Sequence, residues 1–367
     1  MKRLLCIVGS MNMGGAETFL MKLYRNFDRT KYQMDFAVAI AEKGEYDDEI
    51  LNLGGRIYHI TPKSKGTVKN FLDIKNLVRK EQYNYVLRVS QHSLSALELF
   101  AAMLGGSKVR AFRSSNSNAC AGKINGLIHK LCMFMPRNFA NRYIAPSTEA
   151  ASFMFGENYV KSGRVLLLRN AVNHSLFAYN TDYRAQIRQE LGILDNDIVV
   201  GHIGRFNHQK NHTYLLDVFS EILKLKRNSK LILVGKGEKE TQIIDYAKQL
   251  GIIDFISIIS PRHDVNKLYS VFDVLVFPSL FEGMPNVIIE AQAASLPCVT
   301  SDSLTKEAEI TKYVSWMPLS DSPQKWASKA LEMVSMSRQS TIDEFRSNKY
   351  EIKDSVHEFC HLIFDEK

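Results

Sequence analysis

The sequence predicts an α/β protein with two doubly wound domains, each built on a parallel sheet with helices on both faces. The chain has 367 residues, which is more than one hydrophobic core usually contains. Short apolar runs alternate with helical patterns in two successive series, as in parallel sheets assembled from strand–helix units. The run Asp273-Val-Leu-Val-Phe277 is apolar over consecutive residues and suits a strand buried on both faces.

The first series fills residues 1–172, which we predict to be the N-terminal domain. Residues 1–9 resemble the start of a secretory signal, but their apolar core is short and a loop with an amphipathic helix follows. We therefore expect a first strand there instead of a signal peptide. The expected strands are 3–9, 34–40, 56–60, 85–89, 108–112, 143–146 and 165–168, and the expected helices are 16–27, 46–53, 68–81 and 93–104.

The segment 169–182 interrupts the alternation, so we place the domain boundary within it, between residues 172 and 173. A second series fills 173–345, the predicted C-terminal domain, and the pattern of 346–367 is that of a C-terminal helix. The strands expected here are 197–203, 230–234, 255–259, 274–277, 298–300 and 314–317, and the expected helices are 212–225, 239–250, 265–272, 285–294 and 324–336.

The composition indicates a globular enzyme from a reducing compartment. The hydrophobic share of 45% and the charged share of 23% exclude a disordered or low-complexity chain. The five cysteines are widely spaced and include no Cys-x-x-Cys pair, which argues against a disulfide framework or a structural zinc site. The same cysteine pattern fits a reduced cytoplasmic chain. Because no run of about 18 apolar residues occurs, we expect no spanning helix.

The net charge of +8 is unevenly distributed. Residues 99–148 contain no Asp or Glu, and within them the apolar stretch 127–136 has embedded positive charge. Such a segment suits an anionic membrane face, where each basic residue contributes roughly 1 kcal/mol, but a core helix with a solvated basic face fits equally well. A nucleic-acid site is disfavoured because no binding motif is present. The basic residues are Lys108, Arg110, Arg113, Lys123, Lys130, Arg137 and Arg142.

Two glutamates, Glu282 and Glu290, follow the strand 274–277. Glu282 falls in a polar loop, and Glu290 falls in the early turns of a helix that Pro285 and Asn286 begin. Open α/β sheets bind ligands at the carboxyl ends of their strands, where this loop lies. The simpler interpretation is that Glu282 is a solvated loop residue and that Glu290 helps to cap the helix.

A second loop, 204–211, reads Gly-Arg-Phe-Asn-His-Gln-Lys-Asn and follows the first strand of the C-terminal domain. It holds Arg205 and Lys210 at a strand's carboxyl end and before a helix N-terminus, an arrangement that suits a diphosphate. Solvated surface cations are the alternative. In the N-terminal domain, Gly14 and Gly15 open a helix and let the backbone approach an anionic ligand closely, unless they form only a flexible turn.

The remaining motifs point less clearly to a ligand. Gly235-Lys-Gly-Glu238 follows a strand but lacks the third glycine of a dinucleotide fingerprint, so a nicotinamide site is weakly supported. Asp195-Asn-Asp197 matches an Asp-x-Asp metal motif, but it precedes a strand and so lies at the wrong end of the sheet. His208 and His212 are separated by a helix start, which disfavours a shared metal. We therefore predict no metal site.

The spacing of Glu282 and Glu290, with the flanking Glu-Gly-Met-Pro-Asn, resembles the Glu-x7-Glu motif of the retaining glycosyltransferases of family 4. The Gly-Arg…Gln-Lys-Asn loop is similar to the loop that this family has at the same place, and Gly14-Gly-Ala-Glu17 resembles its N-terminal loop. Asn170-Ala-Val-Asn173 followed by Phe177 is similar to its linker. The resemblance implies the GT-B fold, in which two Rossmann-like domains face a cleft and the last helix crosses back onto the first domain.

The resemblance also implies a reaction, the retaining transfer of a sugar from a nucleotide sugar, expected to be a UDP sugar, without a metal or other cofactor. It implies that Arg205 and Lys210 neutralise the departing diphosphate, while Glu282 holds hydroxyls of the sugar. Glu290 would accept hydrogen bonds from the ribose. The other donor contacts that it implies are Gly14, Gly15, Gly204, Gly235, Arg262, Gly283, Met284, Pro285 and Asn286.

The acceptor-side residues implied by the resemblance are His92, Arg113 and Asn116, which follow strands of the N-terminal domain. Many family members carry a histidine where this chain has Arg113 and Asn116. Arg113 could bind an acceptor phosphate or be a basic surface residue. We expect a saccharide or lipid-linked saccharide acceptor, in surface polysaccharide synthesis at the inner face of the cytoplasmic membrane, and no nucleic-acid partner. The absence of that histidine leaves open a catalytically silent sugar-nucleotide-binding subunit of a polysaccharide assembly complex. A second alternative is a sugar-nucleotide epimerase of the same fold.

Overall fold

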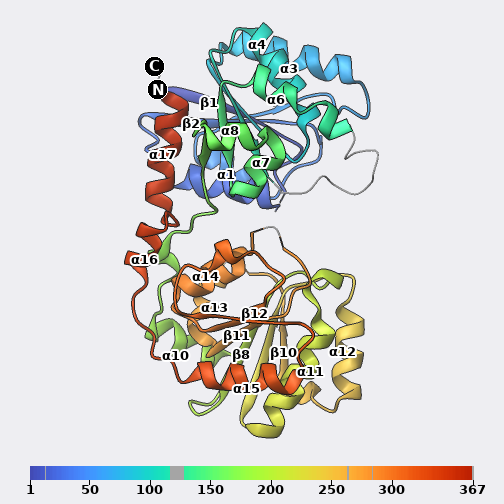
Figure 1. The fold of residues 1–367 in the computed structure, drawn as a ribbon, viewed down its shortest axis with the longest axis vertical. Helices are drawn as coiled ribbons and strands as arrows, with labels where there is room; N and C mark the ends of the chain where they lie inside the picture. The colour runs from blue at the N-terminus through green and yellow to red at the C-terminus, as the bar shows by residue number, and fades with distance from the viewer. Residues whose placement is uncertain (13, 116–127, 263, 283, 366–367) are drawn as a thin grey trace. The chain divides into compact units, whose positions relative to one another are not determined.

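The computed structural model describes residues 1–12, 14–115, 128–262, 264–282 and 284–365. The chain divides into an N-terminal unit, residues 1–171 with 352–367, and a C-terminal unit, residues 172–351. The sequence-based boundaries fall after residues 172 and 345. Each unit contains one all-parallel sheet with helices on both faces (Figure 1), so the predicted fold class is confirmed.

The N-terminal sheet has seven strands in the order β3-β2-β1-β4-β5-β6-β7. Successive residues of its interior strand β1 are buried on opposite faces, with Leu4 in one core cluster and Leu5 in the other. This burial on both faces explains why the strand is apolar from Leu4 to Val8. The strands are β1 (Lys2–Val8), β2 (Tyr32–Val38), β3 (Ile57–His59), β4 (Tyr85–Ser90), β5 (Val109–Ser114), β6 (Arg142–Ala145) and β7 (Val165–Leu167).

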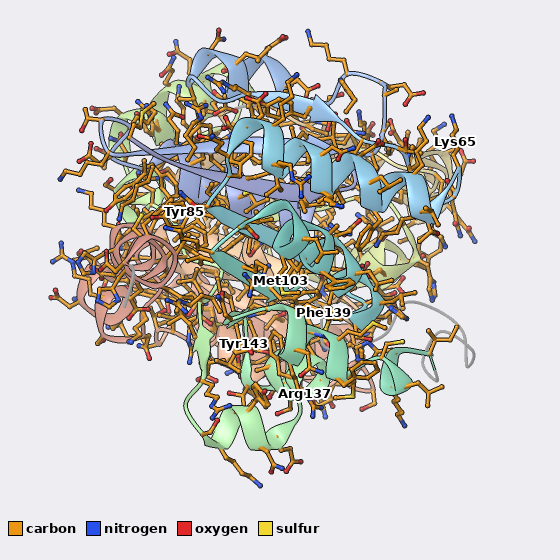
Figure 2. All side chains as sticks on the ribbon, turned by 90° about the horizontal axis from the view of Figure 1, so that it is seen from above. Lys65, Tyr85, Met103, Arg137, Phe139 and Tyr143 are labelled. Atoms are coloured by element: carbon orange, nitrogen blue, oxygen red, sulfur yellow. The ribbon has the colours of Figure 1, made fainter. Side chains whose placement is uncertain are left out.

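The helices of the N-terminal unit cover both faces of its sheet. One face is covered by α1 (Gly15–Arg25), α2 (Asp47–Asn52) and α17 (Ile352–Phe364), and the other by α3 (Thr67–Glu81), α4 (Leu97–Gly105) and α7 (Thr148–Phe155). Figure 2 labels Met103 on α4 and Phe139 on α6 (Phe134–Phe139), two helices that pack together. Two shorter elements are η1 (Ser93–Ala96) and α8 (Glu157–Lys161).

Helix α17 completes the core of the N-terminal unit although it comes last in the chain. It packs against α1. The ring of Phe364 stacks on Tyr32 with 4.5 Å between centroids, and Phe359 lies 6.0 Å from Phe27. Aromatic pairs at these distances add to the apolar area that the helix buries. The helix is therefore a structural part of the unit that the beginning of the chain forms.

The C-terminal sheet has six strands in the order β10-β9-β8-β11-β12-β13. They are β8 (Ile198–Ile203), β9 (Ser229–Val234), β10 (Ile256–Ile259), β11 (Val274–Phe277), β12 (Cys298–Ser301) and β13 (Val314–Met317). One face is covered by α9 (His174–Phe177), α10 (Thr181–Glu190), α13 (Val265–Val271), α14 (Asn286–Ala293) and α16 (Ile342–Ser347). The other is covered by α11 (His212–Leu225), α12 (Glu240–Gln249) and α15 (Pro323–Val334).

The order of strands reverses at one point in each sheet, between β1 and β4 and between β8 and β11. Doubly wound sheets bind ligands at the carboxyl ends of strands beside such a point. The loops with the predicted motifs follow β1, β4 and β5 in one unit, and β8, β9, β10 and β11 in the other. Each unit thus gathers its motif loops at one edge of its own sheet. Within the described ranges, no helix is long and apolar enough to cross a membrane.

Candidate functional site

Lys210 and Glu282 form a nearly buried ion pair at the carboxyl edge of the C-terminal sheet. Lys210 Nζ lies 2.6 Å from Glu282 Oε1, and the two side chains are 13% and 11% exposed. Lys210 Nζ also lies 4.5 Å from the centroid of the Phe277 ring, a favourable cation–π distance. The residues meet because β8 and β11 are neighbours in the sheet, which brings together the loops that follow them. The sequence predicted both residues in one site, but not their direct pairing.

Gln209 and Asn207 fix the backbone on either side of this ion pair. The side-chain Nε2 of Gln209 donates to the backbone carbonyl of Phe281 at 2.8 Å. The backbone carbonyl of Gln209 accepts from the Leu280 N–H at 2.9 Å. Asn207 Oδ1 accepts from the Lys210 N–H at 3.3 Å and caps the short turn η2 (His208–Lys210). Both loops are therefore held in place without a ligand, as expected for a site organised in advance.

Gly204 and Gly235 allow the loops of the site to approach one another. A Cβ atom on Gly204 would lie 2.9 Å from Lys210 Cε, so the glycine leaves room for the lysine side chain. A Cβ atom on Gly235 would collide with the carbonyl of Gly204. The Gly204 N–H donates to Val234 O, and the Gly235 N–H donates to Ile259 O, each at 2.9 Å. Close backbone approach thus requires both glycines, and their contact with a donor stays a prediction.

Two buried histidines, His202 on β8 and His212 on α11, lie next to Lys210. Their rings are 4.8 Å apart, and His202 Nδ1 is 2.9 Å from the carbonyl of Val276. Burial, with a contribution from the charge of Lys210, lowers the pKa of His212 to about 4 and that of His202 well below its usual value. Both rings are therefore neutral at pH 7. The histidine ring that contacts His212 is therefore that of His202 and not that of His208, the neighbour considered from the sequence, which is exposed.

Arg205 and Glu290 occupy different environments. Arg205 is 75% exposed, and its one carboxylate neighbour among the described residues, Glu238, is 3.8 Å away, a weak surface contact. Glu290 is half-buried and accepts a hydrogen bond from the Tyr269 hydroxyl at 2.8 Å. Burial, and the nearby Glu290 carboxylate, raise the pKa of Tyr269, so the phenol keeps its proton and remains a donor. No sequence motif pointed to Tyr269, because one tyrosine in a helix carries no distinctive pattern.

The loop after β11 leads into α14, which begins at Asn286. The Oδ1 atom of Asn286 is buried and has no hydrogen-bond partner in the part of the chain that the structure describes, so it could accept from a hydroxyl donor. Met284 contacts Tyr350 through its sulfur at 4.0 Å, and Pro285 is buried and accepts from the Ile288 N–H. Gly283 lies outside the described residues. These residues line the same edge as the ion pair.

Arg262 follows β10 and is already engaged by acidic neighbours. Its Nε lies 2.5 Å from Asp264 Oδ1, and its Nη1 lies 3.4 Å from Glu190 Oε1. A nucleobase contact would have to compete with the bidentate Asp264 interaction. The predicted role of Arg262 beside a nucleobase therefore has no direct support from this geometry.

The predicted glycine loop of the N-terminal unit leads into α1, with Gly14 at the N-cap position and Gly15 as the first helical residue. The carboxylate of Glu17 lies so close to Gly14 that a Cβ atom there would collide with it. Burial raises the pKa of Glu17. The acid of the first helical turn thus occupies the place predicted for a phosphate, so an arriving phosphate would have to displace it.

The acceptor-side predictions have mixed outcomes. His92 Nδ1 accepts from the Leu94 N–H at 3.2 Å, and its ring makes an edge contact with His129 at 5.4 Å. Arg113, at the end of β5, is only 2% exposed, so the interpretation as a basic surface residue is wrong. Phe19 and Asn170 contact its guanidinium. Asn116 lies outside the described residues.

The comparisons with known proteins identify the family. A model for the glycosyl transferases group 1 matches residues 183–349, a range that contains the Lys210–Glu282 pair. EpsF of Bacillus subtilis (strain 168), described as a glycosyltransferase, is 31% identical over 330 residues, which cover 89% of this chain and 86% of EpsF. The chain belongs to the group 1 glycosyl transferases.

Other relatives of this glycosyltransferase have more specific names. The capsular polysaccharide biosynthesis glycosyltransferase CapH of Staphylococcus aureus is 24% identical over 379 residues, covering 99% of this chain and 98% of CapH. The UDP-Gal:alpha-D-GlcNAc-diphosphoundecaprenol alpha-1,3-galactosyltransferase of Escherichia coli is 26% identical over 243 residues, which are 64% of this chain and 62% of that protein.

A solved structure shows the same fold as this glycosyltransferase. The crystal structure of Anabaena Alr3699/HepE in complex with UDP and glucose superposes with a TM-score of 0.71 at 16% identity, covering 100% of this chain and 96% of HepE. The GT-B fold implied by the sequence resemblance is thereby confirmed. At this identity the likeness concerns the fold alone.

Proposed function

We propose that this glycosyltransferase transfers a sugar from a UDP sugar to a saccharide carried on a lipid diphosphate, with retention and without a metal, in the synthesis of a surface polysaccharide. The Lys210–Glu282 ion pair carries this proposal, because it joins the predicted leaving-group cation to the predicted sugar-binding carboxylate. The names of the relatives support it: one takes UDP-Gal and a diphosphoundecaprenol substrate, and another acts in capsular polysaccharide synthesis. HepE binds UDP.

In the proposed reaction, the bond between the sugar's anomeric carbon and the β-phosphate oxygen breaks, and a bond to the acceptor hydroxyl oxygen forms. The acceptor's proton passes to the departing diphosphate. The negative charge of Glu282 neutralises the positive charge of Lys210 before the donor binds. Glu282 then accepts hydrogen bonds from sugar hydroxyls. Negative charge grows on the departing diphosphate as its bond breaks, so the contact with Lys210 strengthens in the transition state, and exposed Arg205 can add a second cation.

A donor panel tests the proposal. The protein is incubated with UDP, GDP and dTDP sugars in the presence of a chelator, and nucleotide release is measured with and without saccharide acceptors. We expect slow release from one UDP sugar, faster release with acceptor, and loss of both in Lys210→Ala. Binding without turnover would favour the silent subunit, and an epimerised sugar without acceptor would favour the epimerase. No binding and no turnover of any nucleotide sugar would overturn the proposal.

We also propose that the N-terminal unit contacts an anionic membrane surface. Exposed apolar side chains, including Leu131 at 66% and Phe134 at 51%, occur beside exposed Lys130 on the unit's α6 side. Leu94, 38% exposed, comes from η1, which packs against α6. Apolar and basic groups together favour such an interface. Sedimentation with anionic vesicles at low salt is expected to capture the wild type but not Leu131→Ser/Phe134→Ser, and equal capture would contradict the contact.

A further inference from the structure

Arg113 is a buried cation whose contacts leave part of its hydrogen-bonding capacity unused. Its guanidinium lies 3.6 Å from the centroid of the Phe19 ring on α1, and Nη2 donates to Asn170 Oδ1 at 3.1 Å. Its Nε is buried and has no hydrogen-bond partner among the described residues. Burial alone lowers the pKa of Arg113 to about 9, with no acidic neighbour opposing the shift.

This environment differs from that of the other buried arginine in the described part of the chain. Arg188, 4% exposed, has Asp273 at 3.5 Å and donates to the carbonyls of Leu194 and Asp197. Arg113 has no ion pair with any described carboxylate. A buried charge without a countercharge is costly, because it loses hydration and gains little in return. Ionisable groups perturbed in this way cluster at functional sites, where a ligand can supply the missing charge.

The location of Arg113 fits a ligand-binding role. It lies at the carboxyl end of β5, which pairs with β4 beside the point where the strand order reverses. Its planar fork of N–H groups matches a phosphate better than any other side chain does. Asn170 Oδ1 now occupies the position of one acceptor oxygen. An anion would supply both the missing charge and acceptors for the unused donor.

We propose that Arg113 binds a phosphate oxygen of the acceptor substrate, which replaces the carboxamide oxygen of Asn170. The identity of the acceptor rests on the proposed function, whereas the anion site itself does not. Arg113 would then select acceptors that carry their saccharide on a phosphate or diphosphate. Lys210, in the C-terminal unit, would serve the diphosphate of the donor.

Two matched acceptors separate the acceptor phosphate from the donor diphosphate. One carries a saccharide on a short alkyl diphosphate, and the other carries the same saccharide as a simple alkyl glycoside. We expect the wild type to prefer the diphosphate form in kcat/KM, and Arg113→Met to reduce that preference roughly tenfold to hundredfold. If Arg113→Met instead raised the donor KM equally with both acceptors, the cation would serve the donor and the inference would be overturned.

Stability distinguishes ligand binding from a structural role. Replacing an uncompensated buried charge by an apolar side chain of similar length is commonly neutral or stabilising, so Arg113→Met should keep or raise the Tm. Asn170→Asp would supply an internal countercharge, so it should raise the Tm and also lose the diphosphate preference. Arg110→Gln is the control, because Arg110 is on the same strand and donates to the carbonyls of Phe139 and Ser107. It should leave the preference unchanged.

A binding measurement makes the inference independent of turnover. Calorimetric titration with inorganic pyrophosphate is expected to show two sites in the wild type, one lost in Arg113→Met and the other in Lys210→Met. If Arg113→Met binds pyrophosphate like the wild type, keeps the diphosphate preference and melts at a lower temperature, Arg113 is structural and the inference fails. If no donor is turned over, the proposed function fails, and the pyrophosphate stoichiometry still decides the role of Arg113.

Discussion

Removing one partner of the Lys210–Glu282 pair is expected to destabilise the C-terminal unit nearly as much as removing both. At a separation of 2.6 Å, the Coulomb attraction is roughly 6 kcal/mol for an effective dielectric constant of about 20. Desolvation of side chains that are 13% and 11% exposed offsets most of this attraction. Each single variant leaves one charge buried without its partner, at a cost of about 3 kcal/mol. If the double variant loses little more than either single one, the coupling energy in a double-mutant cycle is about 3 kcal/mol.

The assay uses the two tryptophans of the chain, Trp316 and Trp326, which both lie in the C-terminal unit. Their fluorescence during urea unfolding therefore reports this unit selectively. The variants are Lys210→Met, Glu282→Gln and the double substitution.

The pair Lys224–Glu221 is a matched control, with the same 2.6 Å separation but side chains 66% and 16% exposed. Its coupling should stay below about 0.5 kcal/mol, as is usual for surface pairs. An equally small coupling for Lys210 and Glu282 would refute the inference that the two residues are paired in a water-poor site.

Glu290→Gln is expected to raise the donor KM with little change in kcat, whereas Lys210→Ala lowers kcat, because only the phosphate contact strengthens as charge develops. Steady-state kinetics at varied donor concentration measure both, and equal losses confined to KM would contradict the assignment. His212 has a pKa of about 4 in the folded chain, below its unfolded value of about 6.5, so the unfolded state binds the proton more readily between these values. The contribution of His212 to the stability of the C-terminal unit should be fully present above about pH 6.5 and should fall by about 3 kcal/mol toward pH 4, in addition to the decrease from His202, as followed by urea melts. His212→Gln should flatten that decrease, and an unchanged slope would exclude His212 as its source. Phe364→Ala should destabilise the N-terminal unit by about 3 kcal/mol, because the ring stacks on Tyr32, and native-state hydrogen exchange in β1 and β2 measures the loss. Unchanged exchange would show that α17 is dispensable.

The sequence specified the fold well because its local patterns and its tertiary structure agree. Apolar runs such as 274–277 are buried on both faces of a sheet, and the polar segments between them fall at strand ends. The loops with Lys210 and Glu282 could be assigned to one sheet edge, since all parallel strands end there. Their direct pairing was not predictable, because it requires β8 to be the neighbour of β11 and not of another strand.

Other features of the site depend on residues distant in the chain and carry no local signal. Arg113 belongs to a basic segment that reads as surface, and its burial depends on Phe19 and Asn170 from other elements. Tyr269 reaches Glu290 only because α13 and α14 pack on the same face. His202 and His212 become neighbours only when the helix after β8 is in place. Such contacts are properties of packing and not of sequence pattern.

The packing of α17 on the N-terminal unit has a consequence for synthesis on the ribosome. Residues 1–171 cannot complete their core until 352–364 have been made, whereas 172–351 form a continuous segment that can finish folding first. During that interval the nascent first sheet exposes the surface that Phe359 and Phe364 later cover. We therefore expect chaperone dependence and misfolding of the first half of the chain to respond to changes in its last few turns. A stop codon shortly before residue 352 should release a protein whose second half is folded and whose first half aggregates.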